Sequence, residues 1–225
     1  MGVISSRLYG RRKGRGLHVR KTALMQSFLP QVQITLSGEK GLTAGSLFGT
    51  PAPLILEIGF GGGEHLAAQA KRNPEMRFIG CEPFVNGIAS LLDHLERDRI
   101  TNVRVFADDA RVMLDALADA SVETCFVLFA DPWPKKKHRE RRFIGPDSLS
   151  RLARVLKPKG LLRVASDHPQ LIAWTRAQLD GSPAFRCAYA DSVPPPDWIP
   201  TRYQEKALQA GRVPVFMDYR RVDAF

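Results

Sequence analysis

A glycine-rich turn followed by an acid is the first feature of this sequence that could do chemistry. Gly59, Gly61, Gly62 and Gly63 follow an apolar run, and Glu64 comes directly after them. Glycines let the chain turn tightly and approach a ligand closely. Glu64 stands where a dinucleotide-binding fingerprint counted from Gly59 has its third glycine, and an acid at a helix N-terminus disfavours a pyrophosphate. The turn therefore favours a cationic ligand without phosphate, such as S-adenosylmethionine.

Three further acids stand where other apolar runs end. Glu82 lies 19 residues after Gly63, near the spacing at which an acid accepts hydrogen bonds from ribose hydroxyls. Asp109 follows the next run, where an acid can meet the adenine amino group, and Asp131 follows the run after that. Each acid alone could be a helix N-cap or a solvated carboxylate. Acids beside four successive turns together favour a bound cationic cofactor.

Strand and helix patterns alternate after residue 53 and place these acids. Alternation of this kind predicts βαβ units with right-handed crossovers, hence an α/β fold with a doubly wound, mostly parallel, Rossmann-like sheet. Ligands of such sheets bind beyond the carboxyl ends of the strands, where the acids lie. The expected strands are 54–58, 77–81, 103–107, 124–130, 161–165, 185–189 and 213–219, and the expected helices are 64–72, 85–97, 111–117, 147–156 and 169–179.

The positive charge is confined to two short segments. The chain has 225 residues and a net charge of +10; residues 1–38 hold seven basic residues and no acid, and residues 135–142 hold six against one. The remainder is close to neutral. A chain with this distribution meets a polyanion at defined places. We expect residues 1–50 to be a basic arm with one short helix at most, which contacts RNA through Arg11, Arg12 and Arg15, and residues 51–225 to be one domain.

The N-terminal segment admits two other interpretations. Its Arg-rich, acid-free composition is also that of a mitochondrial transit peptide, and Gly2 with Ser6 fits a myristoylation pattern that often matches by chance. No apolar run approaches the roughly 20 residues of a membrane span. The three cysteines are isolated and the five histidines lack ligand spacing, which predicts reduced thiols, a cytoplasmic protein and no metal site.

Several motifs together resemble the bacterial tRNA (guanine-N7-)-methyltransferases. The resemblance extends from about Tyr9 to the C-terminus, and generic methyltransferases lack its most specific element, Asp131-Pro-Trp-Pro-Lys followed by His138 and arginines. The other matching elements are Tyr9–Arg15, Leu56–Gly61, Gly80–Pro83, Arg141–Phe143, Ser166-Asp167 and Thr201–Lys206.

The resemblance implies a seven-stranded class I methyltransferase sheet and roles for particular residues. S-adenosylmethionine would be the cofactor and tRNA the partner, with no membrane and no obligate protein partner, in a monomer or homodimer. Asp131 would be the active-site residue. The cofactor would contact Glu57, Gly59, Gly61, Glu82, Asp109 and Asp131; the substrate would contact Lys135, Asp167, Thr201, Arg202, Tyr203 and Gln204; and RNA would contact Lys137, His138, Arg139, Glu140, Arg141 and Arg142.

One position departs from the family pattern. Family members usually have Glu where this chain has Gln204, and Glu205 stands beside it. Either Gln204 keeps the hydrogen bonds without the charge, or Glu205 takes over after a shift of one residue. Trp133 has two interpretations as well: it could stack on a base, or cap the sheet as a core residue.

The implied reaction needs no strong general base. Guanine N7 carries a free lone pair at neutral pH and has no proton to lose, so catalysis consists of placing N7 in line with the activated methyl group. Carboxylates such as Asp131 and Asp167 suit the N–H donors of guanine's Watson–Crick edge. The alternatives are an RNA methyltransferase with another target atom and a non-catalytic RNA-binding module on the same fold; Glu64 opposes a nicotinamide-dependent oxidoreductase.

Overall fold

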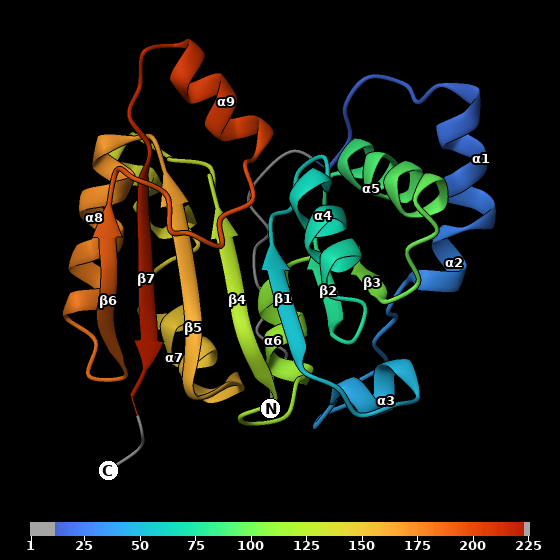
Figure 1. Cartoon of the computed structure of the whole chain (residues 1–225), viewed down its shortest axis with the longest axis horizontal. Helices are drawn as coiled ribbons and strands as arrows, with labels where there is room; N and C mark the ends of the chain where they lie inside the picture. Colours follow the sequence, from blue (N-terminus) through green and yellow to red (C-terminus); the bar gives the residue numbers. More distant parts are fainter. Residues whose placement is uncertain (1–11, 223–225) are drawn as a thin grey trace.

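A seven-stranded sheet forms the centre of the computed structural model, which describes residues 12–222 (Figure 1). The strand order is β3-β2-β1-β4-β5-β7-β6; β1 to β5 pair in parallel, and β7 is antiparallel to both of its neighbours. The predicted α/β, mostly parallel sheet is confirmed. The strands are β1 (Leu54–Ile58), β2 (Arg77–Cys81), β3 (Val103–Phe106), β4 (Val122–Leu128), β5 (Leu156–Ser166), β6 (Phe185–Asp191) and β7 (Val215–Arg221).

Helices cover both faces of the sheet (Figure 1). Leu66 of α4 and Leu91 of α5 belong to the apolar cluster on one face, and Met113 of α6 and Leu152 of α7 to the cluster on the other. All five residues of β1 are buried, as in a strand covered on both sides. These helices are α4 (Glu64–Arg72), α5 (Val85–Arg97), α6 (Ala110–Ala116), α7 (Pro146–Val155) and α8 (Pro169–Asp180).

The strand order reverses between β1 and β4. From β1 the chain proceeds to β2 and β3 on one side, and from β4 it proceeds to β5 on the other. Connections therefore leave the two adjacent carboxyl ends in opposite directions, which opens a crevice at that edge. The edge is the upper one in Figure 1, where α9 (Arg202–Gln209) also lies.

The segment before the sheet contains more structure than expected. Three helices, α1 (Val19–Ser27), α2 (Leu29–Val32) and α3 (Ala44–Phe48), replace the single short helix of the prediction. Leu24 and Val32 are buried in the apolar cluster that also contains α5. Ile34 N donates to the carbonyl oxygen of Val105 at 2.8 Å, beside β3. Because contacts with distant residues hold these helices in place, their own sequences carry little periodicity, and the prediction missed two of the three.

β5 begins earlier than predicted. Pro158 and Gly160 were expected to precede the strand, but β5 runs from Leu156 and the register with β4 shifts between Val122 and Thr124. Residues 157–160 have no pairing partner in β4 because of this irregularity, so the N–H that Pro158 lacks is not needed for a hydrogen bond between the two strands. The helix α9 and a 3₁₀ helix, Lys136–Arg141, were also not predicted.

An ion cluster around the buried Arg163 joins the antiparallel strands β5 and β7. Arg163 of β5 faces Asp218 of β7, and two guanidinium nitrogens donate to the two carboxylate oxygens, each at 2.8 Å. Its other contact is Asp197, at 2.9 and 3.0 Å, in the segment that leads to α9. The cluster therefore couples the sheet to the helix at the carboxyl edge.

Replacement of Arg163 by Met is expected to lower the free energy of unfolding by about 3–5 kcal/mol, because the buried Asp218 carboxylate loses its partner. Urea unfolding measures the change. Arg186→Met, on the exposed outer surface of β6, is the control and should change stability by less than about 0.5 kcal/mol. Equal effects of the two substitutions would show that the buried cluster contributes nothing particular.

Candidate functional site

A cavity of about 330 Å³ lies at the reversal point of the sheet. It is bounded by the carboxyl ends of the first four strands, and one wall comes from α9. Concave sites with a few convergent polar groups are the usual form of a small-molecule site. Its polar and aromatic lining includes Glu82, Asp108, Asp109, Arg111, Asp131, Trp133, Arg141, Phe143 and Tyr203.

The glycine-rich turn forms the floor beside β1. Gly59 has a φ of +73° and Gly61 a φ of +56°, a conformation that residues with a side chain rarely adopt. Gly61 N donates to Glu82 Oε2 at 2.9 Å, and Phe84 N donates to Glu82 Oε1 at 3.0 Å. Both oxygens of Glu82 are thereby oriented by backbone groups, and each retains a lone pair for a ligand.

The surroundings of Glu82 disfavour its charged form. Burial raises the pKa of Glu82 most strongly, backbone hydrogen bonds from Gly61 and Phe84 lower it, and the charges of Asp131 and Glu57 raise it again. Neighbouring carboxylates therefore repel one another, and a cation placed among them relieves that repulsion. S-adenosylmethionine has a sulfonium and an ammonium group, and no phosphate, so the donor set fits it.

Asp109 both caps a helix and lines the cavity. It is the N-cap of α6 and accepts from Arg111 N at 2.9 Å, while its carboxylate also contacts the Arg111 guanidinium. The same side chain lines the cavity. Asp108 beside it pairs with Arg12 at 2.9 Å, so the N-terminal segment reaches the cavity rim.

The loop after β4 forms the opposite wall. Asp131 is exposed, and Trp133 has a φ of +41°, which is rare for a residue with a side chain. The guanidinium carbon of Arg141 lies 5.0 Å from the centre of the Trp133 ring, and the His138 ring meets it edge-on at 5.8 Å. Trp133 therefore stands at the wall of the cavity and not in the core of the sheet.

α9 closes the site from above. Thr201 caps the helix by accepting from Gln204 N at 3.0 Å. Tyr203 lines the cavity with its ring against Gly61, and the residue is 42% exposed. The cations of Arg202 and Lys206 lie 6.0 and 5.8 Å from its ring centre. An aromatic surface flanked by cations suits a nucleic-acid base and its phosphates.

Comparison with known proteins identifies the family of this chain. A family model described as a putative methyltransferase matches residues 51–217. The tRNA (guanine-N(7)-)-methyltransferase of Paramagnetospirillum magneticum is 48% identical over 96% of this chain and 92% of its own, and that of Rhodospirillum rubrum is 42% identical over 96% and 88%. The chain belongs to the tRNA (guanine-N(7)-)-methyltransferase family.

A solved structure supports the same fold. The 16S rRNA (adenine(1408)-N(1))-methyltransferase from Catenulisporales acidiphilia, crystallised as a mutant with its cosubstrate S-adenosylmethionine, superimposes with a TM-score of 0.55 at 17% identity. The match covers 76% of this chain and 86% of that one. The family and this neighbour together establish a class I methyltransferase fold.

Most residues that the family resemblance assigns to the cofactor meet in the cavity. Gly59, Gly61, Glu82, Asp109 and Asp131 line it. Glu57 does not: it is 3% exposed, and its Oε2 lies 2.7 Å from Nδ1 of His65. The contact of Glu57 with the cofactor stays a prediction; in the structure its carboxylate is buried against His65, a residue that the sequence analysis did not single out.

The residues assigned to the substrate are divided. Tyr203 lines the cavity, whereas Lys135, Asp167, Thr201, Arg202 and Gln204 lie outside its lining. Asp167 accepts from Arg212 Nε at 2.5 Å, at the carboxyl end of β5. Gln204 Oε1 accepts from Trp198 Nε1 at 2.6 Å. Gln204 thus anchors α9 to the segment before it, while Glu205 is exposed.

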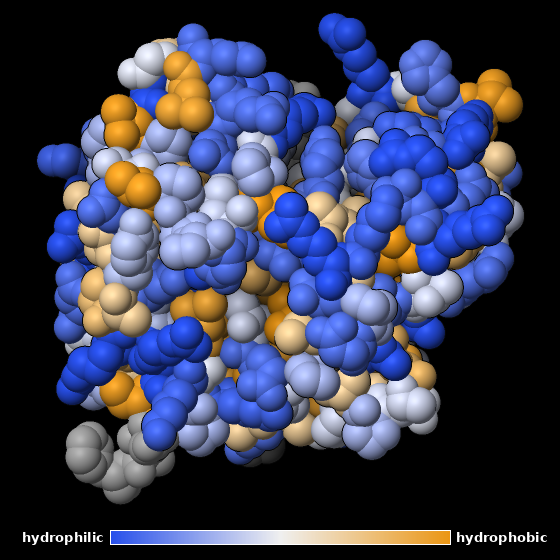
Figure 2. All heavy atoms as spheres, viewed as in Figure 1, coloured by the Kyte–Doolittle hydropathy of each residue, from blue (hydrophilic) through white to orange (hydrophobic). Residues whose placement is uncertain are grey.

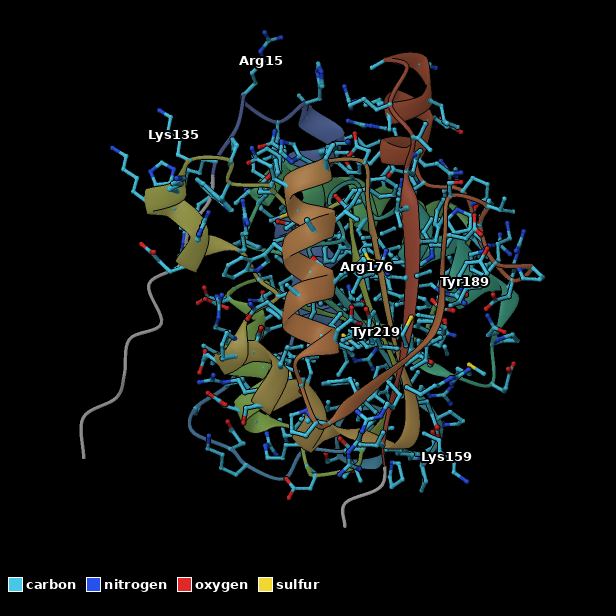
Figure 3. The ribbon with its side chains drawn as sticks, turned by 90° about the vertical axis from the view of Figure 1, so that its left-hand side faces the viewer. Arg15, Lys135, Lys159, Arg176, Tyr189 and Tyr219 are labelled. Carbon is cyan, nitrogen blue, oxygen red and sulfur yellow. The ribbon has the colours of Figure 1, made fainter. Side chains whose placement is uncertain are left out.

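The basic residues gather at the cavity edge of the molecule. Lys135 and Arg15 project outward at the same end, opposite Lys159 (Figure 3). Lys137, Arg139 and Glu140 are exposed on the 3₁₀ helix, and His138 is half-buried. Arg142 is the exception, because it is buried; its predicted contact with RNA stays a prediction. Arg11 lies outside the described residues.

Other site types find no support in the part of the chain that the structure describes. Within residues 12–222, no helix has the length and apolarity needed to cross a membrane, and no group of three metal-binding side chains comes together. The face that carries α4, α5 and α9 is mostly hydrophilic, with apolar side chains in small separate groups (Figure 2).

Affinity for S-adenosylmethionine is expected to fall as the pH is lowered. The pKa of Glu82 is raised by burial, so this carboxylate gains a proton at a higher pH than an ordinary glutamate and then offers fewer acceptors to the ribose. Calorimetric titration between pH 8 and pH 5 should show a rising Kd for the native chain. Glu82→Gln should bind about 10-fold more weakly at neutral pH and vary less with pH. Parallel pH profiles for the two proteins would contradict the assignment.

Proposed function

We propose that this protein transfers a methyl group from S-adenosylmethionine to N7 of a guanine in tRNA, the variable-loop guanine by family resemblance. The observation that carries the proposal is the basic 3₁₀ helix Lys136–Arg141, joined by one short loop to the acid-lined cavity. The acidic residues suit a cationic cofactor and the basic residues suit a polyanion, so a single edge of the sheet accommodates both substrates.

The residues of the chain perform positioning, not proton transfer. When bound, S-adenosylmethionine supplies an electrophilic methyl group on its sulfonium. Glu82 would hold the ribose and Asp109 the adenine, while Asp131 would stand where the cofactor meets the guanine. Trp133 and Tyr203, which both line the cavity, offer aromatic surfaces for the guanine ring.

The reaction balances without a base. The N7 lone pair forms the new N–CH₃ bond as the S–CH₃ bond breaks, and the products are 7-methylguanosine and S-adenosylhomocysteine. Because no proton is released from N7, the cavity needs only to orient the ring and exclude water. We place the enzyme in the cytoplasm, where its tRNA is available, as a monomer or homodimer without an obligate protein partner.

Incubation with methyl-labelled S-adenosylmethionine and unmodified tRNA tests the proposal. The label is expected in tRNA at a guanine where N7-specific strand cleavage occurs. Label at another atom would establish a different RNA methyltransferase, and tight tRNA binding without label would establish a non-catalytic binding module. Either of the last two results would overturn the proposed function.

A further inference from the structure

Arg142 differs from the other basic residues of its segment in being inside the protein. It is 6% exposed, although five of its neighbours between Lys135 and Arg141 carry positive charge at or near the surface. Its Nε donates to the carbonyl oxygen of Pro132 at 3.0 Å, and its Nη2 donates to that of Trp133 at 3.3 Å. The guanidinium is thus bonded to the loop that follows β4.

That loop carries the residues of the cavity wall in an unfavourable conformation. The φ of +41° at Trp133 is in the left-handed region, which costs of order 1 kcal/mol or more for a residue with a side chain. Such a conformation persists only when surrounding contacts hold it. The fork of Arg142 binds the carbonyl groups of the two peptide links that flank Trp133, which is the place where the backbone turns.

The position of Arg142 itself is fixed from two sides. Its guanidinium carbon lies 5.2 Å from the centre of the Trp174 ring on α8, and Trp174 Nε1 donates to the carbonyl oxygen of Ile144 at 2.6 Å. Its backbone N–H donates to the carbonyl oxygen of Arg139 at 3.1 Å and ends the 3₁₀ helix. Arg142 therefore connects three elements: α8, the 3₁₀ helix Lys136–Arg141 and the loop that follows β4.

We propose that Arg142 is a positioning residue for methyl transfer, which holds the Asp131–Pro134 loop in its cavity-lining conformation and does not bind tRNA. The inference rests on the proposed function. It divides the basic segment by role: exposed cations such as Lys137 and Arg139 supply electrostatic affinity for tRNA, while the buried cation places Asp131 and Trp133. A planar fork is required, since a single ammonium cannot reach two carbonyl groups in the same geometry.

Salt dependence of tRNA binding separates the two roles. Each phosphate contact contributes about 0.7–0.9 to the slope of log K against log salt concentration. Arg142→Lys and Arg142→Met should keep the slope of the native chain and a tRNA Kd within about 2-fold of the native value. Arg139→Met removes an exposed charge from the same segment and should lower the magnitude of the slope by about 0.7–0.9, the contribution of one phosphate contact. In methyl-transfer kinetics, Arg142→Lys should lower kcat at least 10-fold with little change in the KM for tRNA.

Limited trypsin digestion adds a readout that does not depend on methyl transfer. Release of the loop in Arg142→Lys should raise the rate of cleavage between Lys135 and Arg141 several-fold. Native kcat with native cleavage in Arg142→Lys, or a slope lowered as much by Arg142→Met as by Arg139→Met, would overturn the inference. If the native chain methylated no tRNA, the proposed function would fail, and the cleavage rates and salt slopes would still decide whether Arg142 holds the loop.

Discussion

Replacement of Asp131 by Ala is expected to lower kcat for tRNA methylation by about 100-fold or more, while S-adenosylmethionine still binds measurably. Asp131 follows the buried end of β4 and is exposed at the cavity. It lines the cavity together with Glu82 of the cofactor loop and Tyr203 of α9. A carboxylate at that point can accept the N–H donors of guanine and hold N7 toward the methyl group.

Two separate measurements on Asp131→Ala test this expectation. Single-turnover methylation measures the chemical step, and calorimetric titration measures S-adenosylmethionine binding. Asp119→Ala removes an exposed acid that does not line the cavity, in the turn between α6 and β4, and should change neither quantity. A kcat near the native value in Asp131→Ala would remove Asp131 from the active site.

Where strands and helices alternate, much of this fold could be predicted from the sequence. β1, α4, β2 and α5 have the predicted bounds, because buried parallel strands and amphipathic helices leave strong local patterns. The acids at the strand ends were predictable for the same reason: the topology brings every carboxyl end to one edge. A pattern in the sequence therefore sufficed to place Glu82, Asp109 and Asp131 at one cavity.

What the sequence could not predict depends on contacts between distant residues. Glu57 and Arg142 belong to motifs whose spacing suggests ligand contact, but tertiary packing buries Glu57 against His65 and Arg142 against the loop carbonyls. α9 is short, and its position depends on the Trp198–Gln204 bond and on the segment that Arg163 fixes. A motif identifies residues that act together; only packing separates those that touch the ligand from those that hold their neighbours.

A glycine inside α5 illustrates a functional position without any motif. A Cβ added at Gly87 would lie 2.2 Å from the carbonyl oxygen of Gly61 and 3.4 Å from Glu82 Cγ. Both neighbours belong to the proposed cofactor site. Because Gly in a helix interior costs about 1 kcal/mol relative to Ala, its presence in the first turn of α5 was a usable signal. The close approach of helix and glycine turn explains why the helix accepts that cost.

Gly87→Ala is expected to raise the Kd for S-adenosylmethionine by about 10- to 100-fold, equivalent to about 1.4–2.7 kcal/mol. The atom that must move is backbone, so the glycine turn shifts and its contact with Glu82 is lost. Gly45→Ala is the matched control: Gly45 is also helical, in α3, and its added Cβ would meet its nearest atom at 3.6 Å. That variant should keep native affinity in calorimetric titration, because an ordinary contact displaces nothing. If Gly87→Ala bound the cofactor as tightly as Gly45→Ala, the glycine turn would not be the element that holds it.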